Sequence, residues 1–185
     1  MAADMDLLAK VDWGGVRSSL PGETTDQAIS VAAWLEAALP AHIPMLLAAA
    51  RALADDESEA RDLVQSTVEI ALRKGAQVRD RAALPGWLLT VQTREALRLR
   101  RRLRRLIPLG RSEIEPSTQA PGPEAAALHQ ALAKLSPRVR AAIVLHHMAG
   151  LSVAEVAMAL EVSPNTVKTQ LLQGLAKLRG LLGDD

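Results

Sequence analysis

Residues 151–178 read LSVAEVAMALEVSPNTVKTQLLQGLAKL. The helix start signals in this stretch decide the fold of the second half of the chain. Ser152 and Glu155 have the spacing of a capping box, which opens a short helix. Ser163-Pro164 has the form of an N-cap followed by proline at the first helical position, so a second helix begins there. Since only three residues separate the two helices, the stretch predicts a helix-turn-helix.

The second of these helices carries an apolar and a polar face. Its core positions should be the apolar residues at i, i+4, i+8 and i+11, which are Val167, Leu171, Leu175 and Leu178. Such a helix lies in the major groove, where Asn and Gln bond adenine, Thr meets a thymine methyl and Lys takes phosphate or guanine. We therefore predict DNA contacts by Ser163, Asn165, Thr166, Lys168, Thr169, Gln170 and Gln173. A helical hairpin used only for protein contacts is the alternative. Two capped helices at tight-turn spacing, with a second helix that is polar rather than acidic, favour DNA.

The remaining segments with a helical period precede this motif. They are expected at about 26–39, 42–55, 58–74, 84–106, 124–135 and 137–149. Gly75 and Gly150 are natural stops for two of them. No stretch alternates like a strand, so the sequence predicts an all-α fold.

Composition divides the chain into two small helical domains. Residues 107–123 contain four prolines and two glycines, which predicts a Pro/Gly-rich linker rather than a packed element. Residues 1–25 show no sustained period and predict a flexible acidic arm. The two domains are therefore expected at 26–106 and 124–182.

Charge is distributed unevenly although the formal net charge is only +1. Ten arginines lie between Arg79 and Arg111 against two acids, whereas residues 1–40 carry six acids against two bases. This asymmetry is typical of a chain that meets a polyanion at one place, and we expect the acidic arm to fold over the basic helix and restrain DNA binding. The acidic stretch 55–57 is expected to be ordinary solvated surface.

Other classes of protein find little support. The chain has no cysteine, which excludes disulfides and thiolate metal sites. The adjacent His146 and His147 point about 100° apart on a helix, so they share no metal geometry. The most apolar run, 39–54, is short and broken by prolines, so no membrane span is expected. No catalytic constellation appears, and we predict neither an enzyme, nor a cofactor, nor a small-molecule substrate.

Three motifs of the second half resemble region 4 of extracytoplasmic-function (ECF) sigma factors, which reads the promoter's upstream, minus-thirty-five element. They are Leu135-Ser-Pro-Arg-Val-Arg140, Gly150-Leu-Ser-Val-Ala-Glu155 and Val162-Ser-Pro-Asn-Thr-Val-Lys-Thr169. Two-component and quorum-type regulators carry a related helix-turn-helix. However, such regulators would add a receiver or ligand domain with strands.

The first half resembles region 2 of the same family. Glu59-Ala-Arg-Asp-Leu-Val-Gln65 is similar to the motif whose helix grips the clamp helices of RNA polymerase, which implies that Asp62, Leu63 and Gln65 bind the polymerase. Trp87-Leu-Leu-Thr-Val91 and the basic helix after it are similar to regions 2.3 and 2.4. The basic side of that helix is expected to hold DNA through Arg94, Arg98, Arg101, Arg102 and Arg105.

Region 2.4 is also where the chain departs from the family. The family's Asn and Asp, which read and capture an unpaired base of the minus-ten element, are replaced by Arg94 and Arg98. Trp87 is the only aromatic residue in this region, whereas single-strand capture uses stacking faces or a shaped pocket. This helix is therefore expected to hold DNA mainly through charge, in a divergent sigma factor or in a sigma-like regulator that does not open promoters.

The resemblance implies a sigma factor that directs bacterial core RNA polymerase to specific promoters. The alternative is a DNA-binding transcriptional regulator that does not itself open them. The implied partners are promoter DNA and core RNA polymerase, through its clamp helices and flap, and an anti-sigma factor would be a further partner. The implied location is the cytoplasm, in association with the nucleoid.

Overall fold

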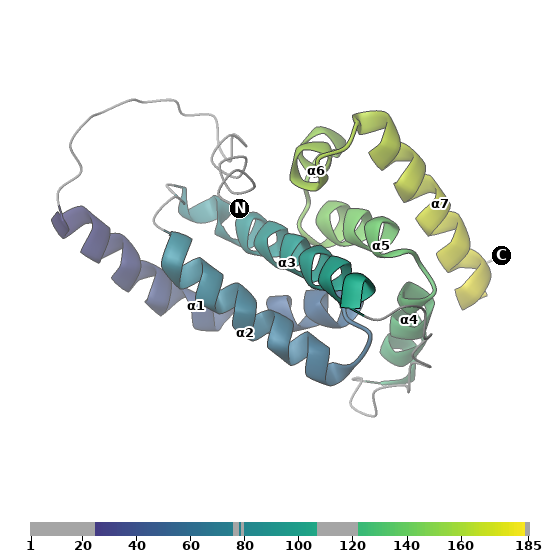
Figure 1. Ribbon diagram of the computed structural model, residues 1–185, viewed down its shortest axis with the longest axis horizontal. Coiled ribbons are helices and arrows are strands. Elements are labelled where there is room, and N and C mark those ends of the chain that lie inside the picture. The colour runs from purple at the N-terminus through teal and green to yellow at the C-terminus, as the bar shows by residue number, and fades with distance from the viewer. Residues whose placement is uncertain (1–24, 76–77, 79, 107–121, 184–185) are drawn as a thin grey trace.

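The computed structural model describes residues 25–75, 78, 80–106 and 122–183, and these ranges are built from helices joined by short turns (Figure 1). The expected all-α fold is confirmed. The elements of the first half are α1 (Thr25–Leu53), α2 (Glu57–Lys74), the short 3₁₀ turn η3 (Arg81–Ala83) and α3 (Leu84–Leu106). Those of the second half are α4 (Pro123–Ala133), α5 (Pro137–Ile143), the π-helical segment η4 (Val144–Met148), α6 (Val153–Leu160) and α7 (Pro164–Leu182).

Helix α1 corrects the expectation of two helices, 26–39 and 42–55. It continues through Pro40 and Pro44, although each proline removes a backbone donor and crowds the preceding turn. Both rings are exposed, while Leu39 and Leu46 on either side of them are buried. Continuous burial of one apolar face therefore outweighs the local cost of the prolines.

The same helix contains a stretch, 33–53, that is long and apolar enough to cross a membrane by length and composition alone. The expectation that this part of the chain is too short for a span was therefore wrong as a statement about length. A core helix of a soluble protein meets the same criterion. In this window 28% is buried, and the buried side, which includes Leu46, Ala49 and Ala50, lies on a helix that contacts α2, α3, α4 and α5.

Helix α2 begins one residue earlier than expected, at Glu57, and ends for a reason other than the expected one. Its N-cap is Asp56, whose side chain accepts a hydrogen bond of 2.8 Å from the N–H of Glu59. Gly75 ends it with a right-handed φ of −65°, so the glycine is not needed for a left-handed turn. It is needed for space, because a Cβ at this position would collide with the side chain of Leu35.

The second half forms the expected helix-turn-helix with α4 and α5 behind it. Ser152 and Glu155 make the capping box of α6 in both directions, with bonds of 3.3 and 2.7 Å. Of the expected core of α7, Val167, Leu171 and Leu178 are buried and Leu175 is half-buried. Gly174 of α7 is buried as well, and a Cβ at this position would meet the side chains of Ile143 and Val139 of α5.

The two halves pack against each other. In Figure 1, α3 lies between the α1–α2 pair and the group formed by α5, α6 and α7. Helix α3 contacts α5, η4 and α6, and α1 contacts α4, α5 and η4. The expected domain bounds stay a prediction, and both the acidic arm up to residue 24 and most of the linker (107–121) lie outside the described residues.

Candidate nucleic-acid interface

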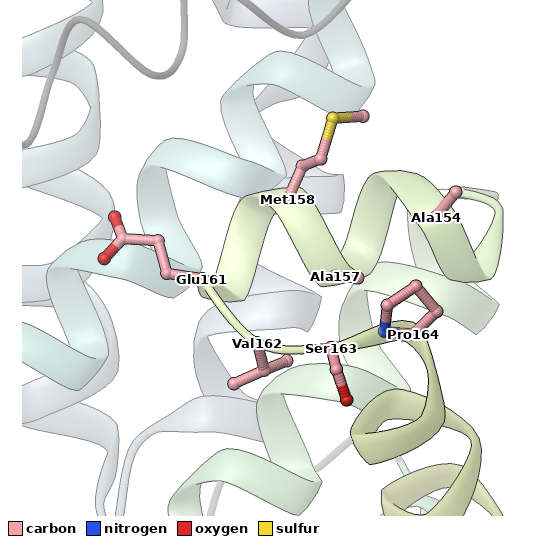
Figure 2. Close-up of a pocket in the computed structure, with 7 residues that line it drawn as sticks. All are labelled: Ala154, Ala157, Met158, Glu161, Val162, Ser163 and Pro164. Carbon is pink, nitrogen blue, oxygen red and sulfur yellow. The ribbon is translucent and has the colours of Figure 1, made fainter.

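The turn between α6 and α7 is tight because one residue adopts a left-handed conformation. Glu161 has φ 57° and ψ 48°, and its N–H closes the end of α6 on the carbonyls of Ala157 and Met158. The N–H of Val162 then returns to the Ala157 carbonyl at 3.0 Å. Figure 2 shows the open depression around this turn, which is lined by Ala154, Ala157, Met158, Glu161, Val162, Ser163 and Pro164. The turn sets the direction of α7 away from α6.

Helix α7 exposes most of the side chains that sequence analysis assigned to DNA. Those of Asn165, Thr166, Lys168, Thr169 and Gln173 are all exposed. The Thr169 hydroxyl donates back to the Asn165 carbonyl at 3.0 Å, which leaves the hydroxyl oxygen able to accept a bond from outside. These side chains surround the N-terminal half of α7, the part of a recognition helix that meets base edges.

Two of the assigned residues of α7 have different surroundings. Ser163 is the N-cap, and its oxygen accepts from the N–H of Thr166 at 3.1 Å, so its role is to fix the helix start. Gln170 is half-buried, and its Oε1 is buried without a hydrogen-bond partner in the structure. Gln170 therefore belongs to the side of the helix, and its assignment to the DNA face is not supported.

One residue on this face was missed. Leu172 is 73% exposed, the largest value among the exposed large apolar residues of the described chain. It follows Lys168 by four residues and therefore lies on the same side of α7. An apolar side chain at such a position can contact a thymine methyl. From sequence, Leu172 was assigned neither to the core nor to the DNA face, although its spacing from Leu171 and Leu175 does not fit the buried side.

The basic side of α3 is only partly open. Arg101 and Arg102 are exposed, and the side chain of Arg105 lies outside the described residues. Arg98 is exposed as well, but it forms an ion pair with Glu95 on its own helix, with Nε 2.6 Å from Oε2. This hydrogen bond raises the pKa of Arg98 above its ordinary value, and burial opposes the rise only in part.

Arg94 was expected to bind DNA, but in the structure its side chain is half-buried and bonds to helix α6. Its Nε donates to the Ala159 carbonyl at 2.8 Å, and a terminal nitrogen donates to the Met158 carbonyl at 3.3 Å. Both carbonyls lie in the last turn of α6, where the helix dipole is negative. In this conformation the guanidinium of Arg94 joins α3 to the helix-turn-helix, and its expected role in DNA binding would require that this contact be broken.

The expected polymerase-binding motif lies on α2. Asp62 and Gln65 are both exposed, and the Gln65 amide donates to Glu69 at 3.1 Å. Leu63, in contrast, is 1% exposed and belongs to the core, so it holds the helix in place and cannot be a contact in this conformation. Of the three residues assigned to the polymerase, only Asp62 and Gln65 are available to a partner.

Arg140 is the main residue that sequence analysis missed. It is 2% exposed, and one terminal nitrogen donates to the carbonyls of Leu53 and Ala54 at the end of α1, at 3.1 and 3.2 Å. The other donates to the carbonyls of Ala133 and Leu135 at 3.1 and 3.4 Å. An arginine on the apolar side of a helix, three residues before Ile143, was the signal that a buried acceptor set exists.

Asp55 links Arg140 to a second arginine. Its carboxylate lies 2.5 Å from Arg100 of α3 and 3.3 Å from Arg140 of α5, so it is not the ordinary surface residue that was expected. Burial alone would raise the pKa of Asp55, but the hydrogen bond and charge of Arg100, with those of Arg140, hold it below its ordinary value. Burial lowers the pKa of Arg140, and the charge of Arg100 lowers it further, while Asp55 opposes both.

The histidine pair makes an edge-on ring contact. The ring centroids of His146 and His147 are 4.9 Å apart, and Nδ1 of His146 lies 2.7 Å from the Leu151 carbonyl. Among the described residues, no group of three or more His, Asp or Glu side chains is placed to hold a metal ion. Both histidines lie on η4, and His146 joins that segment to Leu151, just before α6.

Two protein families match this chain, one for each half. Residues 40–106 match the family described as Sigma-70 region 2, and residues 125–178 match Sigma-70, region 4. The first covers α2, α3 and the second half of α1, and the second covers most of α4 to α7.

Named relatives span both halves. The RNA polymerase sigma-E factor of Streptomyces coelicolor is 31% identical over 138 residues, which are 72% of this chain and 77% of that protein. The ECF RNA polymerase sigma factor SigE of Mycolicibacterium smegmatis is 30% identical over 181 residues, or 86% of this chain and 68% of that protein.

The fold also resembles solved structures. The sigma factor RpoE of Bartonella quintana, crystallised with the anti-sigma factor NepR, superposes with a TM-score of 0.67 at 26% identity. That match covers 81% of this chain and 97% of the other. CnrH, in complex with the cytosolic domain of CnrY, gives a TM-score of 0.57 at 25% identity, with 86% and 97% covered.

Proposed function

The chain belongs to the sigma-70 family as an ECF-type RNA polymerase sigma factor, and we propose which of its surfaces bind promoter DNA and which bind the polymerase. Its function is to direct core RNA polymerase to specific promoters and so to initiate transcription. The presence of regions 2 and 4 in one chain supports this function and not the alternative of a separate DNA-binding regulator. Members of the family are initiation factors that act on the polymerase in the cytoplasm.

The observation that carries the proposal is the exposed polar face of α7 behind a capped helix start. We assign reading of the upstream element to Asn165, Thr166, Lys168, Thr169 and Gln173. Their side chains include the amides, hydroxyls and ammonium group that recognise base edges and phosphates. Four of the five are neutral, which suits sequence reading more than general attraction to DNA.

Helix α3 serves a different purpose in this proposal. Arg98, Arg101 and Arg102 hold the phosphate backbone near the downstream element, and Arg105 extends the row along the sequence. Arginine chains that contact phosphates give affinity and register rather than base recognition. The replacement of the family's Asn and Asp by Arg94 and Arg98 is consistent with this emphasis on charge.

Helix α2 supplies the contact with the polymerase. The exposed Asp62 and Gln65 would meet the clamp helices, while the second half of the chain would meet the flap. An anti-sigma factor is a further partner in this proposal, since the two solved relatives were crystallised with such partners or a part of one. We also infer that the protein is associated with the nucleoid when it acts. No cofactor, metal or enzymatic activity enters the proposal.

The test is run-off transcription with core polymerase and fragmented genomic DNA from the same source, followed by sequencing of the transcripts. The expected result is a set of specific starts that share an upstream motif. The double variant Asp62→Ala, Gln65→Ala should lose transcription and polymerase binding but keep DNA binding by α7. Glu124→Gln, an exposed carboxylate on α4, is the control and should behave like the natural protein. An unchanged double variant would contradict the assignment of the polymerase contact.

A further inference from the structure

Leu172 lies on the outward side of α7, where an apolar side chain is least expected. It is 73% exposed, and Asn165, two turns earlier, is exposed as well. Since each helical residue points about 100° from the last, Asn165 and Leu172 point within about 20° of each other. The buried Val167, Gly174 and Leu178 point about 120–160° away from Leu172. The same ridge of α7 therefore carries an amide and a large apolar group.

We propose that Leu172 is a specificity-determining residue, which contacts the C5-methyl group of a thymine in the upstream element. The inference rests on the proposed function in placing α7 in the major groove of promoter DNA. It goes further by naming the base that this side chain selects, and by placing that base relative to the one read by Asn165.

The neighbours of Leu172 are those of a base-reading surface. Lys168 lies one turn before it and Gln173 directly follows it, and both are exposed. Lys168 is the only cation in residues 164–173, so this part of α7 has no arginine for the bidentate contact that most often selects guanine. Discrimination among the bases therefore depends largely on amides, on hydroxyls and on the one exposed leucine.

The chemistry of the major groove determines which base suits a leucine. The thymine C5-methyl is the apolar group that base pairs present there, whereas the other groups are hydrogen-bond donors and acceptors. Against one of those, Leu172 would remove water without replacing its hydrogen bond, which is unfavourable. Leu172 therefore favours thymine and also disfavours the other bases at the same position.

Leu181 shows that exposure alone does not make such a contact. It is 45% exposed on the same helix, and single exposed apolar residues are common on soluble proteins. However, it lies in the last turn between Gly180 and Leu182, and it points about 180° away from Leu172. Base edges meet the N-terminal part of a recognition helix, so Leu181 offers a matched control.

The position of the thymine follows from the helix rise. Leu172 follows Asn165 by seven residues, which corresponds to about 10 Å along the helix axis. Successive base pairs of duplex DNA are separated by about 3.4 Å, so this length covers about three base pairs. The thymine should therefore lie about three base pairs from the base that Asn165 reads.

The experiment selects duplexes from a library randomised over the upstream element. It uses the full chain bound to core RNA polymerase and, in parallel, the full chain alone. Each thymine of the selected sequence is then replaced singly by deoxyuridine, which removes the methyl group and preserves base pairing. We expect one position where this replacement weakens binding about fourfold, the contribution of one buried methyl group. The base preference relaxed by Asn165→Ala should lie about three base pairs away.

Three variants assign the effect to the side chain. Leu172→Ala should bind thymine and deoxyuridine equally at that position, because the apolar partner of the methyl group is gone. Leu172→Met keeps an apolar side chain of similar volume and should retain the discrimination. Leu181→Ala makes the same truncation at the other exposed leucine and should retain the full fourfold effect. Circular dichroism checks that all three variants keep their helices.

Three results would overturn the inference. They are the absence of any thymine whose methyl group affects binding, a fourfold effect that persists in Leu172→Ala, and loss of the effect in Leu181→Ala. A chain that fails to bind core polymerase would count against the proposed function alone, since the selection with the chain alone still measures the methyl contact. A factor that initiates transcription without any methyl effect would count against the role of Leu172 alone.

Discussion

Helices α3 and α7 are both expected to meet DNA, yet they are prepared for it in opposite ways. Helix α7 exposes mainly neutral hydrogen-bonding side chains along a surface that no other part of the described chain covers. Helix α3 carries a row of arginines, but its first half is enclosed, and Arg94 and Arg100 are bonded to main-chain carbonyls of other helices. The polar face of α7 is exposed in the free protein, whereas the first half of α3 is packed against other helices.

The difference teaches that the same residue type can do two kinds of work on one helix. An arginine attracts phosphates, and it is also the side chain best suited to cap several carbonyls at once, because it has five donors in a fixed fork. Sequence alone does not distinguish these uses. Burial distinguishes them: Arg94 lies where the second half of the chain packs on α3 and is half-buried, whereas Arg98, Arg101 and Arg102 further along α3 are exposed.

The largest effect should come from removing the buried arginine that joins the halves. Arg140→Met leaves the carbonyls of Ala54, Ala133 and Leu135 without this donor, and it leaves Leu53 and Asp55 with Arg100 alone. It should lower the free energy of unfolding by about 3–5 kcal/mol, the usual cost of breaking a buried charge network. Urea unfolding measures the loss. Arg138→Met, on an exposed position of the same helix, should change it by less than about 0.5 kcal/mol. Equal losses would mean that the carbonyl network does not hold the halves together.

The next effect separates the two helices on DNA, using a promoter fragment identified by run-off sequencing. Asn165→Ala should weaken binding by about 1–3 kcal/mol and relax base preference at one position, with the salt dependence unchanged. Arg101→Gln should weaken binding to all sequences and reduce the salt slope by about one. Binding isotherms at several salt concentrations give both values. If the two variants exchange these signatures, the division between reading by α7 and holding by α3 is wrong.

A smaller effect tests how closely α7 must approach its own support. Gly174→Ala places a Cβ 2.6 Å from Ile143 Cδ1 and 2.8 Å from Val139 Cγ1, so these side chains or the helices that carry them must shift. Gly180→Ala on the same helix meets nothing within 4 Å and should stabilise it by about 0.5–1 kcal/mol. We expect Gly174→Ala to destabilise by about 1–2 kcal/mol instead. Thermal unfolding of the pair measures the difference, and similar values would show that α7 has more room than the structure indicates.

The smallest effect concerns the turn that aims α7. Glu161 has a left-handed backbone, which is unfavourable for a residue with a Cβ, so Glu161→Gly should stabilise the protein by about 0.5–1 kcal/mol. Glu155→Gly removes one arm of the capping box and should destabilise by about 1 kcal/mol. Urea unfolding of both variants checks the opposite signs. A loss of stability in Glu161→Gly would indicate that its side chain, and not its backbone, sustains the turn.

Local chemistry explains which parts of the fold could be predicted. The starts of α6 and α7 follow from Ser152 and Ser163, because a capping side chain acts on amides two or three residues away. Helix α1 could not be predicted correctly, since the prolines argue locally for a break and only the buried leucines on both sides outweigh them.

The candidate site divides along the same line. The exposed side chains of α7 could be predicted, because the helical period separates them from the buried valine and leucines. The burial of Leu63 and the inward position of Gln170 depend on neighbouring helices, so the sequence could not predict them. Arg94 was expected on a DNA surface because its alternative acceptors lie more than sixty residues further along the chain. Long-range acceptors of this kind leave no mark in the neighbouring sequence.

The π-helical segment Val144–Met148 has a consequence for where the chain can change in length between homologous proteins. Such a turn is equivalent to an α-helix that has gained a single residue, and the extra residue is absorbed within the widened turn. The capped helices on the far side of Gly150 then keep their register. One codon could be gained or lost at this place while the reading helix kept its aim. Length differences between natural variants of this protein should therefore concentrate here rather than in α6 or α7.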